Sequence, residues 1–142
     1  MLLRVAALTV AITSLASPGP ADDKKPKRPT VELRASPRVA VVPGNVIFTA
    51  EIKGGEDEAL RCVTLSWDWG DGNTSEQDEV DCDPADGSPV SRRFTQDREF
   101  RQQGRPTVTV TVRKAGSIVA KDSVGLILQE KRDTDLKMRH IQ

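Results

Sequence analysis

Apolar and polar residues alternate in several short segments of this chain. The clearest is residues 63–69, where Val63, Leu65, Trp67 and Trp69 are separated by single polar residues. In an extended strand, side chains two positions apart project to the same face. The alternation therefore predicts a half-buried strand that sends two indole rings into one core.

The same alternation recurs on both sides of this segment. It predicts inward faces made of Val46, Phe48, Ala50 and Ile52 in one strand, and of Val108, Val110 and Val112 in another. Val31, Leu33 and Ala35 alternate before Pro37, and Val39 and Val41 follow it, as in an edge strand that breaks and changes sheets. Residues 118–128 predict a last strand, with a bulge where the alternation slips near Asp122.

Glycine or proline separates these segments, and no long helical pattern is present. Short strands at this spacing predict an all-β, immunoglobulin-like sandwich of two antiparallel sheets with about seven strands. Phe94 and Phe100 are the aromatic residues that the pattern does not place.

The tryptophan strand ends in an acidic glycine turn. Gly70 and Gly72 permit a positive φ on either side of Asp71, and a short carboxylate can accept hydrogen bonds from neighbouring backbone N–H groups. The six residues together resemble the Trp-Asp-Phe-Gly-Asp-Gly signature of polycystic kidney disease (PKD) domains: Trp67, Asp68, Trp69, Gly70, Asp71 and Gly72.

Flanking segments extend the resemblance over roughly residues 30 to 128. Residues 43–50 resemble the second strand of PKD domains, and residues 100–112 resemble the approach to and course of their penultimate strand. Two departures are evident: the path from the glycine turn to that strand is longer than usual, and Arg98 and Phe100 stand where the family often has His-x-Tyr. The resemblance implies a PKD-type sandwich, and it nominates Asp68 and Asp71 as calcium ligands.

The two ends of the chain differ from the middle. Residues 1–21 have a basic start at Arg4, an apolar run of about 12 residues and small residues for cleavage after Ala16 or Ala21, which predicts a secretory signal peptide. A retained membrane anchor is disfavoured, because that run is shorter than the ~20 residues a span requires. We expect a charged, proline-containing linker at 22–30, one domain at 31–128 and a charged flexible tail at 129–142.

Cys62 and Cys82 are the only cysteines. In a secreted or periplasmic protein an even pair predicts a disulfide. Cys62 falls on the outward register of the tryptophan strand. The disulfide is therefore expected to tether the acidic loop of residues 73–87 to the surface of the sandwich without crossing the core. Free thiols or a metal site are the alternative, although two cysteines without histidine partners do not complete a zinc shell.

Composition narrows the function classes. The formal net charge is zero, so neither nucleic acid nor an anionic membrane is implied as a partner. The chain has no tyrosine, and its two tryptophans are expected in the core, which weakens sugar binding by ring stacking. The single histidine, His140, lies near the end of the expected tail, and no catalytic residue is predicted.

Charge is segregated along the chain. Acidic residues dominate 54–87, and a basic stretch follows that supplies a candidate binding surface: Arg92, Arg93, Arg98, Arg101 and Arg105. The alternative is that the two stretches lie side by side and neutralise each other. Asp81, Asp83 and Asp86 are weak candidates for calcium ligands because their carboxylates are closely spaced, although the spacing is not that of an EF-hand. No other cofactor is expected.

These observations favour a secreted, non-catalytic binding or spacer module that contacts a protein or a cell-envelope component. The alternative is a carbohydrate-binding accessory module, and an enzyme is a third, disfavoured class. Outward aromatic rings on a flat face would favour sugar as the ligand.

Overall fold

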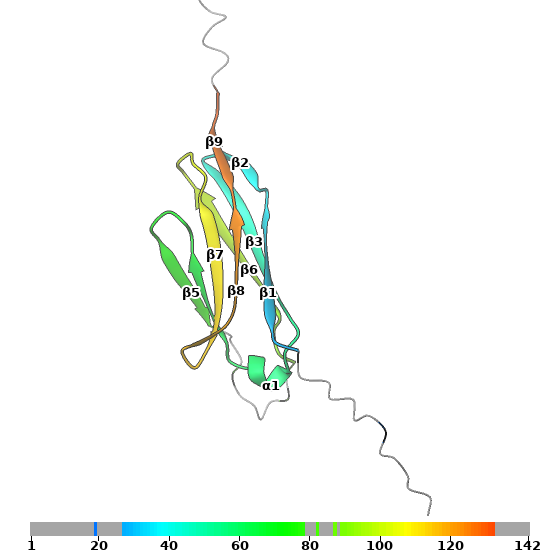
Figure 1. Cartoon of the computed structure of the whole chain (residues 1–142). Helices are drawn as coiled ribbons and strands as arrows, with labels where there is room; N and C mark the ends of the chain where they lie inside the picture. Colours follow the sequence, from blue (N-terminus) through cyan, green and yellow to red (C-terminus); the bar gives the residue numbers. More distant parts are fainter. Residues whose placement is uncertain (1–18, 20–26, 79–81, 83–86, 88, 133–142) are drawn as a thin grey trace, which may run out of the picture.

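Two packed β-sheets, a separate pair of strands and one helical turn form the described part of the chain (Figure 1). This part comprises residues 19, 27–78, 82, 87 and 89–132 of the computed structural model. The elements are β1 Thr30–Ser36, β2 Val39–Val42, β3 Gly44–Lys53, α1 Asp57–Leu60, β4 Thr64–Asp68, β5 Thr74–Asp78, β6 Arg93–Phe100, β7 Thr107–Lys114, β8 Ser117–Gly125 and β9 Ile127–Glu130.

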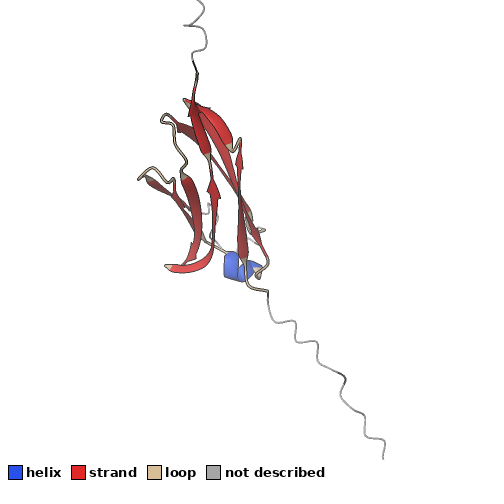
Figure 2. Cartoon of the chain, turned by 45° about the horizontal axis from the view of Figure 1, so that its top comes forward, coloured by secondary structure: helices blue, strands red, loops and turns tan. Residues whose placement is uncertain are grey.

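The strands form a sandwich, with a further parallel pair at one end. One sheet has the order β1-β3-β6 and the facing sheet has the order β5-β4-β7-β8, and every pairing within them is antiparallel. β2 pairs with β9 in parallel, with Val39 opposite Ile127. Figure 2 shows the layers and α1 at the end opposite β2 and β9. The all-β sandwich predicted from the alternation is therefore confirmed.

The core lies between the two sheets. Val46, Phe48, Ala50 and Ile52 of β3 face Leu65 and Trp67 of β4 and the three valines of β7, all of them buried. Trp67 is fully buried and Trp69 nearly so, and their rings stack with centroids 5.4 Å apart at an interplanar angle of 7°. The ring of Phe48 meets both indoles edge-on. Phe94 and Phe100, which the pattern left unplaced, are also buried.

Nine strands occur among the described residues where about seven were predicted, because two long strands are each divided. The predicted break at Pro37 separates β1 from β2, and β2 does join a different sheet. The phase of the alternation also changes there: Ala40 and Val42 are buried, while Val39 and Val41 are exposed. Leu126 separates β8 from β9, whose last residues, Gln129 and Glu130, were expected in the tail.

The bulge predicted near Asp122 lies elsewhere. The register of β7 and β8 shifts between Val112 and Arg113, next to Ala120 and Ile118. Asp122 keeps the inward register, opposite the buried Val110. Its carboxylate accepts a hydrogen bond of 2.8 Å from the backbone N–H of Leu33 in β1. The polar residue that interrupts the alternation is therefore a link between the edges of the two sheets.

The α1 end is fastened by backbone contacts and by the disulfide. Arg92 donates hydrogen bonds to the carbonyls of Gly54 and Gly55 and pairs with Asp57 at 2.5 Å. Cys62 and Cys82 form a disulfide, with Cα atoms 4.8 Å apart. Cys62 is half-buried and Cys82 exposed, so the bridge lies at the surface.

The position of Cys62 differs from the expected one. It lies in a turn before β4, not on the strand, and its φ is 58°, outside the extended region. The outward register assigned to it therefore does not apply, although the bridge still lies outside the core.

The described ends of the chain lie at opposite ends of the sandwich (Figure 1). The carbonyl of Lys27 accepts a hydrogen bond from the N–H of Gly55 next to α1, whereas Arg132 follows β9 at the far end. No helix among the described residues has the length and hydrophobicity needed to span a bilayer. Most of the predicted signal peptide and linker, and the tail from residue 133, lie outside the described residues.

Replacing the central indole tests the core. We expect Trp67→Ala to lower the free energy of unfolding by about 3 to 5 kcal/mol, because it removes a large buried ring from a close-packed site. Ile118→Ala, at a side chain that is 58% exposed, should change it by less than about 0.5 kcal/mol. Urea melts of the three proteins measure both values, and equal midpoints for wild type and Trp67→Ala would contradict the assignment.

Removing the disulfide tests the surface clip. The double change Cys62→Ser and Cys82→Ser opens a loop with a sequence separation of 20 and should cost about 3 kcal/mol on the chain-entropy model. Peptide mapping without reductant should recover one cross-linked peptide that contains both cysteines. Two free thiols in protein from an oxidising compartment would show that the bridge does not form.

Candidate functional site

The glycine turn is held by its own carboxylates. Asp68 Oδ1 accepts a hydrogen bond of 3.0 Å from the N–H of Gly70, and Asp71 Oδ1 accepts one of 3.0 Å from the N–H of Asn73. Gly70 has a φ of 71°, and a Cβ there would lie 2.5 Å from the carbonyl oxygen of Thr107. The motif therefore needs glycine at position 70 for two reasons: a left-handed backbone, and close approach to β7.

Arg98 covers this turn from the opposite sheet. It takes an inward register on β6 between the buried Phe94 and Phe100. Its guanidinium lies 4.8 Å from the ring centroid of Trp69 and 5.6 Å from that of Phe100, and it donates to Asp71 Oδ2 at 2.6 Å. The arginine that departs from the PKD pattern thus stabilises the fold through cation–π contacts and an ion pair.

These contacts set the protonation of Asp71. Burial by itself raises the pKa of this carboxyl group, but hydrogen bonds from Arg98 and from the Asn73 amide, together with the charge of Arg98, outweigh burial and hold the pKa below its ordinary value of 3.8. Asp71 therefore stays ionised while it receives both donors.

The five arginines proposed as one binding surface have different roles. Arg92 and Arg98 are half-buried and bind the carbonyls and carboxylates described above. Arg93 pairs with Glu51 at 3.5 Å, and Arg101 pairs with Glu99 at 3.0 Å. Arg105 forms no ion pair within the described part of the chain. Neighbouring acidic and basic groups thus neutralise each other at four of the five positions.

The five aspartates predicted as calcium candidates do not form one site among the described residues. Asp68 and Asp71 are already occupied as hydrogen-bond acceptors in the turn. Asp81, Asp83 and Asp86 lie outside the described residues. Across the residues that are described, no group of three or more acidic, cysteine or histidine side chains is placed to hold a metal ion.

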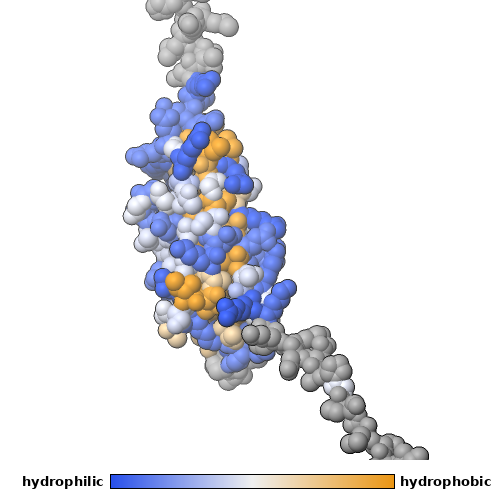
Figure 3. Space-filling view, in the orientation of Figure 1, coloured by the Kyte–Doolittle hydropathy of each residue, from blue (hydrophilic) through white to orange (hydrophobic). Residues whose placement is uncertain are grey.

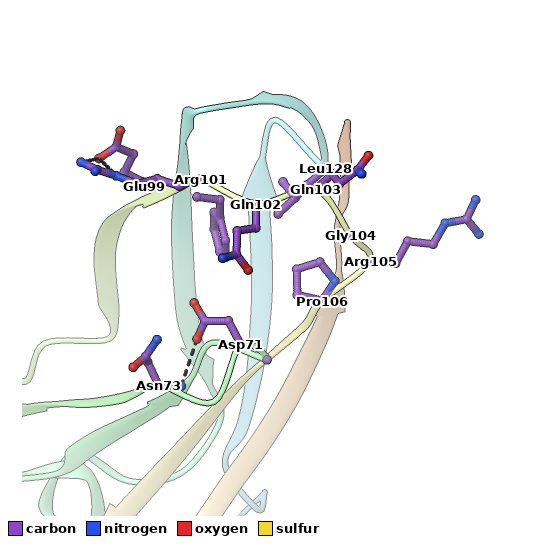
Figure 4. Close-up of a pocket in the computed structure, with 12 residues that line it drawn as sticks. Asp71, Asn73, Glu99, Arg101, Gln102, Gln103, Gly104, Arg105, Pro106 and Leu128 are labelled. Atoms are coloured by element: carbon purple, nitrogen blue, oxygen red, sulfur yellow. Dashed lines mark hydrogen bonds and ion pairs between the residues drawn. The ribbon is translucent and has the colours of Figure 1, made fainter. Parts of the chain in front are cut away.

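A hollow of about 610 Å³ opens beside this turn, between the turn and the loop that joins β6 to β7. Its lining includes Asp71, Asn73, Phe100, Gln102 and Arg105. Figure 4 shows Asp71 and Gln102 directed toward the same space, while Arg105 extends away from it. The hollow offers amide and carboxylate groups around one buried ring.

A second hollow, of about 930 Å³, adjoins the first and shares four of its lining residues: Gln103, Gly104, Arg105 and Leu128. Two backbone hydrogen bonds join Gly104 and Leu128, which line both hollows. Val41, Ile127, Glu130, Lys131 and Arg132 complete much of its wall.

Three exposed β-branched side chains, two of which line the second hollow, form what we call the apolar strip. Val39 is 54% exposed, Val41 53% and Ile127 39%. Val39 lies opposite Ile127 across the β2–β9 pair, and Val41 follows two positions along β2. Figure 3 shows apolar surface at this end of the molecule with hydrophilic side chains beside it.

Sequence reasoning missed the apolar strip because it assigned Val39 and Val41 to the phase of Val31 and Leu33. The available signal was Pro37, since the chain can change direction and face at a proline. Residues 39–42 are valine, alanine, valine and valine, so both phases are apolar and the pairing with β9 decides which phase is buried.

The ion pair between Arg98 and Asp71 predicts a pH effect. Because the pKa of Asp71 is lower in the folded state, its carboxylate stabilises the fold above the ordinary pKa, and this stabilisation is lost as the pH falls through the folded-state value. We expect Arg98→Gln to lower stability at pH 7 by about 1 to 2 kcal/mol, allowing for partial exposure of the pair. As the pH falls below 3.8 and through the lower folded-state pKa of Asp71, the difference should shrink.

Thermal unfolding of wild type and Arg98→Gln from acid to neutral pH measures this effect. Arg105→Gln makes the same change at an exposed arginine that forms no ion pair among the described residues; it is the matched control and should follow the wild-type pH profile. A constant difference between Arg98→Gln and wild type at every pH would show that the ion pair contributes nothing beyond packing.

Comparisons with known proteins show which solved structures have a similar fold. No protein-family model matches the sequence, and no curated protein is similar to it in sequence. Among solved structures, the PKD domain of an M14-like peptidase from a Thermoplasmatales archaeon is 10% identical, with a TM-score of 0.55 over 74% of this chain and 99% of that one.

A CARDB domain from Pyrococcus furiosus is similar in two structures, each 13% identical. Its solution structure has a TM-score of 0.54 over 73% of this chain and 96% of that one. Its crystal structure, in complex with di-metal ions, has a TM-score of 0.50 over 75% and 96%. Together with the Trp67–Gly72 turn, these likenesses show that the chain has the immunoglobulin-like β-sandwich fold of a PKD-type domain.

Proposed function

We propose that this chain is a secreted, non-catalytic module that binds a protein or another cell-envelope component through its β2–β9 end. The observation that carries the proposal is the apolar strip of Val39, Val41 and Ile127 beside an open hollow. Exposed apolar side chains that are contiguous and bordered by polar ones mark contact surfaces more often than scattered ones do.

The polar groups near this end serve the fold. Asp71 accepts hydrogen bonds from Arg98 and from the backbone N–H of Asn73, and Glu99 forms an ion pair with Arg101. A reactive acid or base needs a free position next to a substrate, and these carboxylates are engaged in internal contacts. They support a binding role over a catalytic one.

The aromatic residues weigh against the carbohydrate-binding alternative. The chain has three phenylalanines, two tryptophans and no tyrosine, and all five rings are buried. Sugar-binding faces generally use exposed rings for stacking. A protein surface or an extended chain fits the aliphatic strip better than a pyranose does.

A secreted location agrees with the predicted signal peptide and with the surface disulfide, which persists in oxidising compartments. Entry of the described chain at the α1 end and exit at the β9 end also suits a spacer, because neighbouring segments would be held apart by the length of the sandwich.

A binding assay with the purified full chain tests the proposal. Immobilised protein should retain material from an envelope extract of the source organism, and Val39→Ser with Val41→Ser should reduce the retained amount several-fold. Ile118→Ser is the control, because Ile118 is equally exposed but belongs to the β7–β8 hairpin. Equal loss in both variants, or none in either, would contradict a contact at the apolar strip. Competition by soluble polysaccharide would instead favour the carbohydrate-binding function.

A further inference from the structure

The surroundings of the apolar strip are basic at both ends. Arg38 precedes β2 and donates to the carbonyl of Gly125 at 3.4 Å, which holds its charge beside Val39 and Ile127. At the other end the second hollow carries Arg105 and Lys131, against Glu130 as its one carboxylate among the described lining residues. Arg132, which also lines this hollow, makes an interaction of its own within the chain. An occupant of this surface therefore meets a positive field around an aliphatic centre.

This field argues against a second copy of the chain as the occupant. In a two-fold symmetric contact the same patch meets itself. The patch carries Arg38, Arg105 and Lys131 against Glu130, so its net positive charge would oppose itself across the interface, and like charges opposed across an interface cost several kcal/mol. A partner with complementary, negative charge does not carry this penalty.

The geometry of β2 favours an extended chain as that partner. The carbonyl of Arg38 accepts a hydrogen bond from the N–H of Ile127, so alternate residues of β2 face β9, and Val39 and Val41 direct their backbone groups to the other side. β9 is the strand that pairs with β2 among the described residues. The carbonyl oxygen of Val41 lies against Gly44, where the chain turns into β3, so the other edge of β2 can accept a strand over a short length at Val39.

The spacing of the exposed side chains of β2 also suits an extended peptide. Val39 and Val41 are two positions apart, which is the period at which an extended peptide presents side chains to one face. An acidic peptide with an apolar residue at every second position would place these against the strip, and the carboxylates that flank this segment would lie near Arg38 at one end and near Arg105 and Lys131 at the other.

Resting on the proposed function, we propose that the β2–β9 end binds an extended, acidic polypeptide segment of a partner protein, with alternating apolar and carboxylate side chains. The strip takes the apolar residues, and the basic groups at its two ends take the charge.

Amide NMR of the labelled full chain tests this, with a short capped peptide of alternating glutamate and valine as the probe. Addition should shift the amides of Val39–Val42, Arg105 and Ile127–Lys131. Raising the salt to about 0.5 M should weaken binding several-fold, because screening then acts over a few Å. The same peptide with lysine in place of glutamate should not bind.

Two variants with the same charge change supply the control. Arg105→Glu should weaken binding of the acidic peptide about tenfold, which corresponds to about 1.4 kcal/mol. Lys121→Glu, on the outer face of β8 and away from both hollows, should leave it unchanged. Equal losses in both variants, or equal binding of the lysine peptide, would overturn the proposal.

Two further outcomes separate this inference from the proposed function. If vesicles rich in an anionic phospholipid shift these amides and the acidic peptide does not, the occupant is a membrane surface and the inference is wrong. If neither probe binds while the Val39 and Val41 double variant still loses envelope material, the contact site stands and only the class of partner is wrong.

Discussion

The stacked indoles of Trp67 and Trp69 are the contact on which the other features of this domain depend. Trp67 lies near the end of β4 and Trp69 directly after it. Their rings fill the space between the sheets, where the ring of Phe48 meets both of them and also the ring of Phe100. Because Trp69 is the last inward residue, the chain must reverse directly after it, and Gly70 makes that reversal against the backbone of Thr107. The acidic turn is therefore a consequence of how far the aromatic core extends.

Polar side chains close the two sides of the sandwich where the sheets are not joined by strands. On one side Gln77 of β5 meets Gln96 of β6 at 2.9 Å, and Arg98 meets Asp71; on the other, Asp122 of β8 meets the backbone of β1. Inward polar residues at edge strands also hinder pairing with other chains. The β5, β6 and β8 edges are protected in this way, whereas β2 carries valine on both faces.

The sequence was sufficient for the fold, because its signal is local: period-two alternation placed Trp67, Val46 and Val110 in one core, and the glycine turn identified the PKD-type pattern. The errors arise from partners distant in sequence. Asp122 looked like a bulge because Leu33, 89 positions away, is its hydrogen-bond donor. Arg92 and Arg98 looked like surface cations because their acceptors come from other elements. The phase of Val39 and Val41 depends on β9.

The two ends of the sandwich consequently differ in how many of their side chains remain available to a partner. At the α1 end, Arg92, Lys114 and the disulfide use their groups to fasten the chain to itself. At the β2–β9 end, Arg105 extends outward, and the strip exposes aliphatic surface that no described residue covers. Burial of that surface by a partner would be favourable at about 25 cal/mol per Å². Stability and recognition are thus assigned to opposite ends, so changes at the apolar strip can alter binding without weakening the aromatic core.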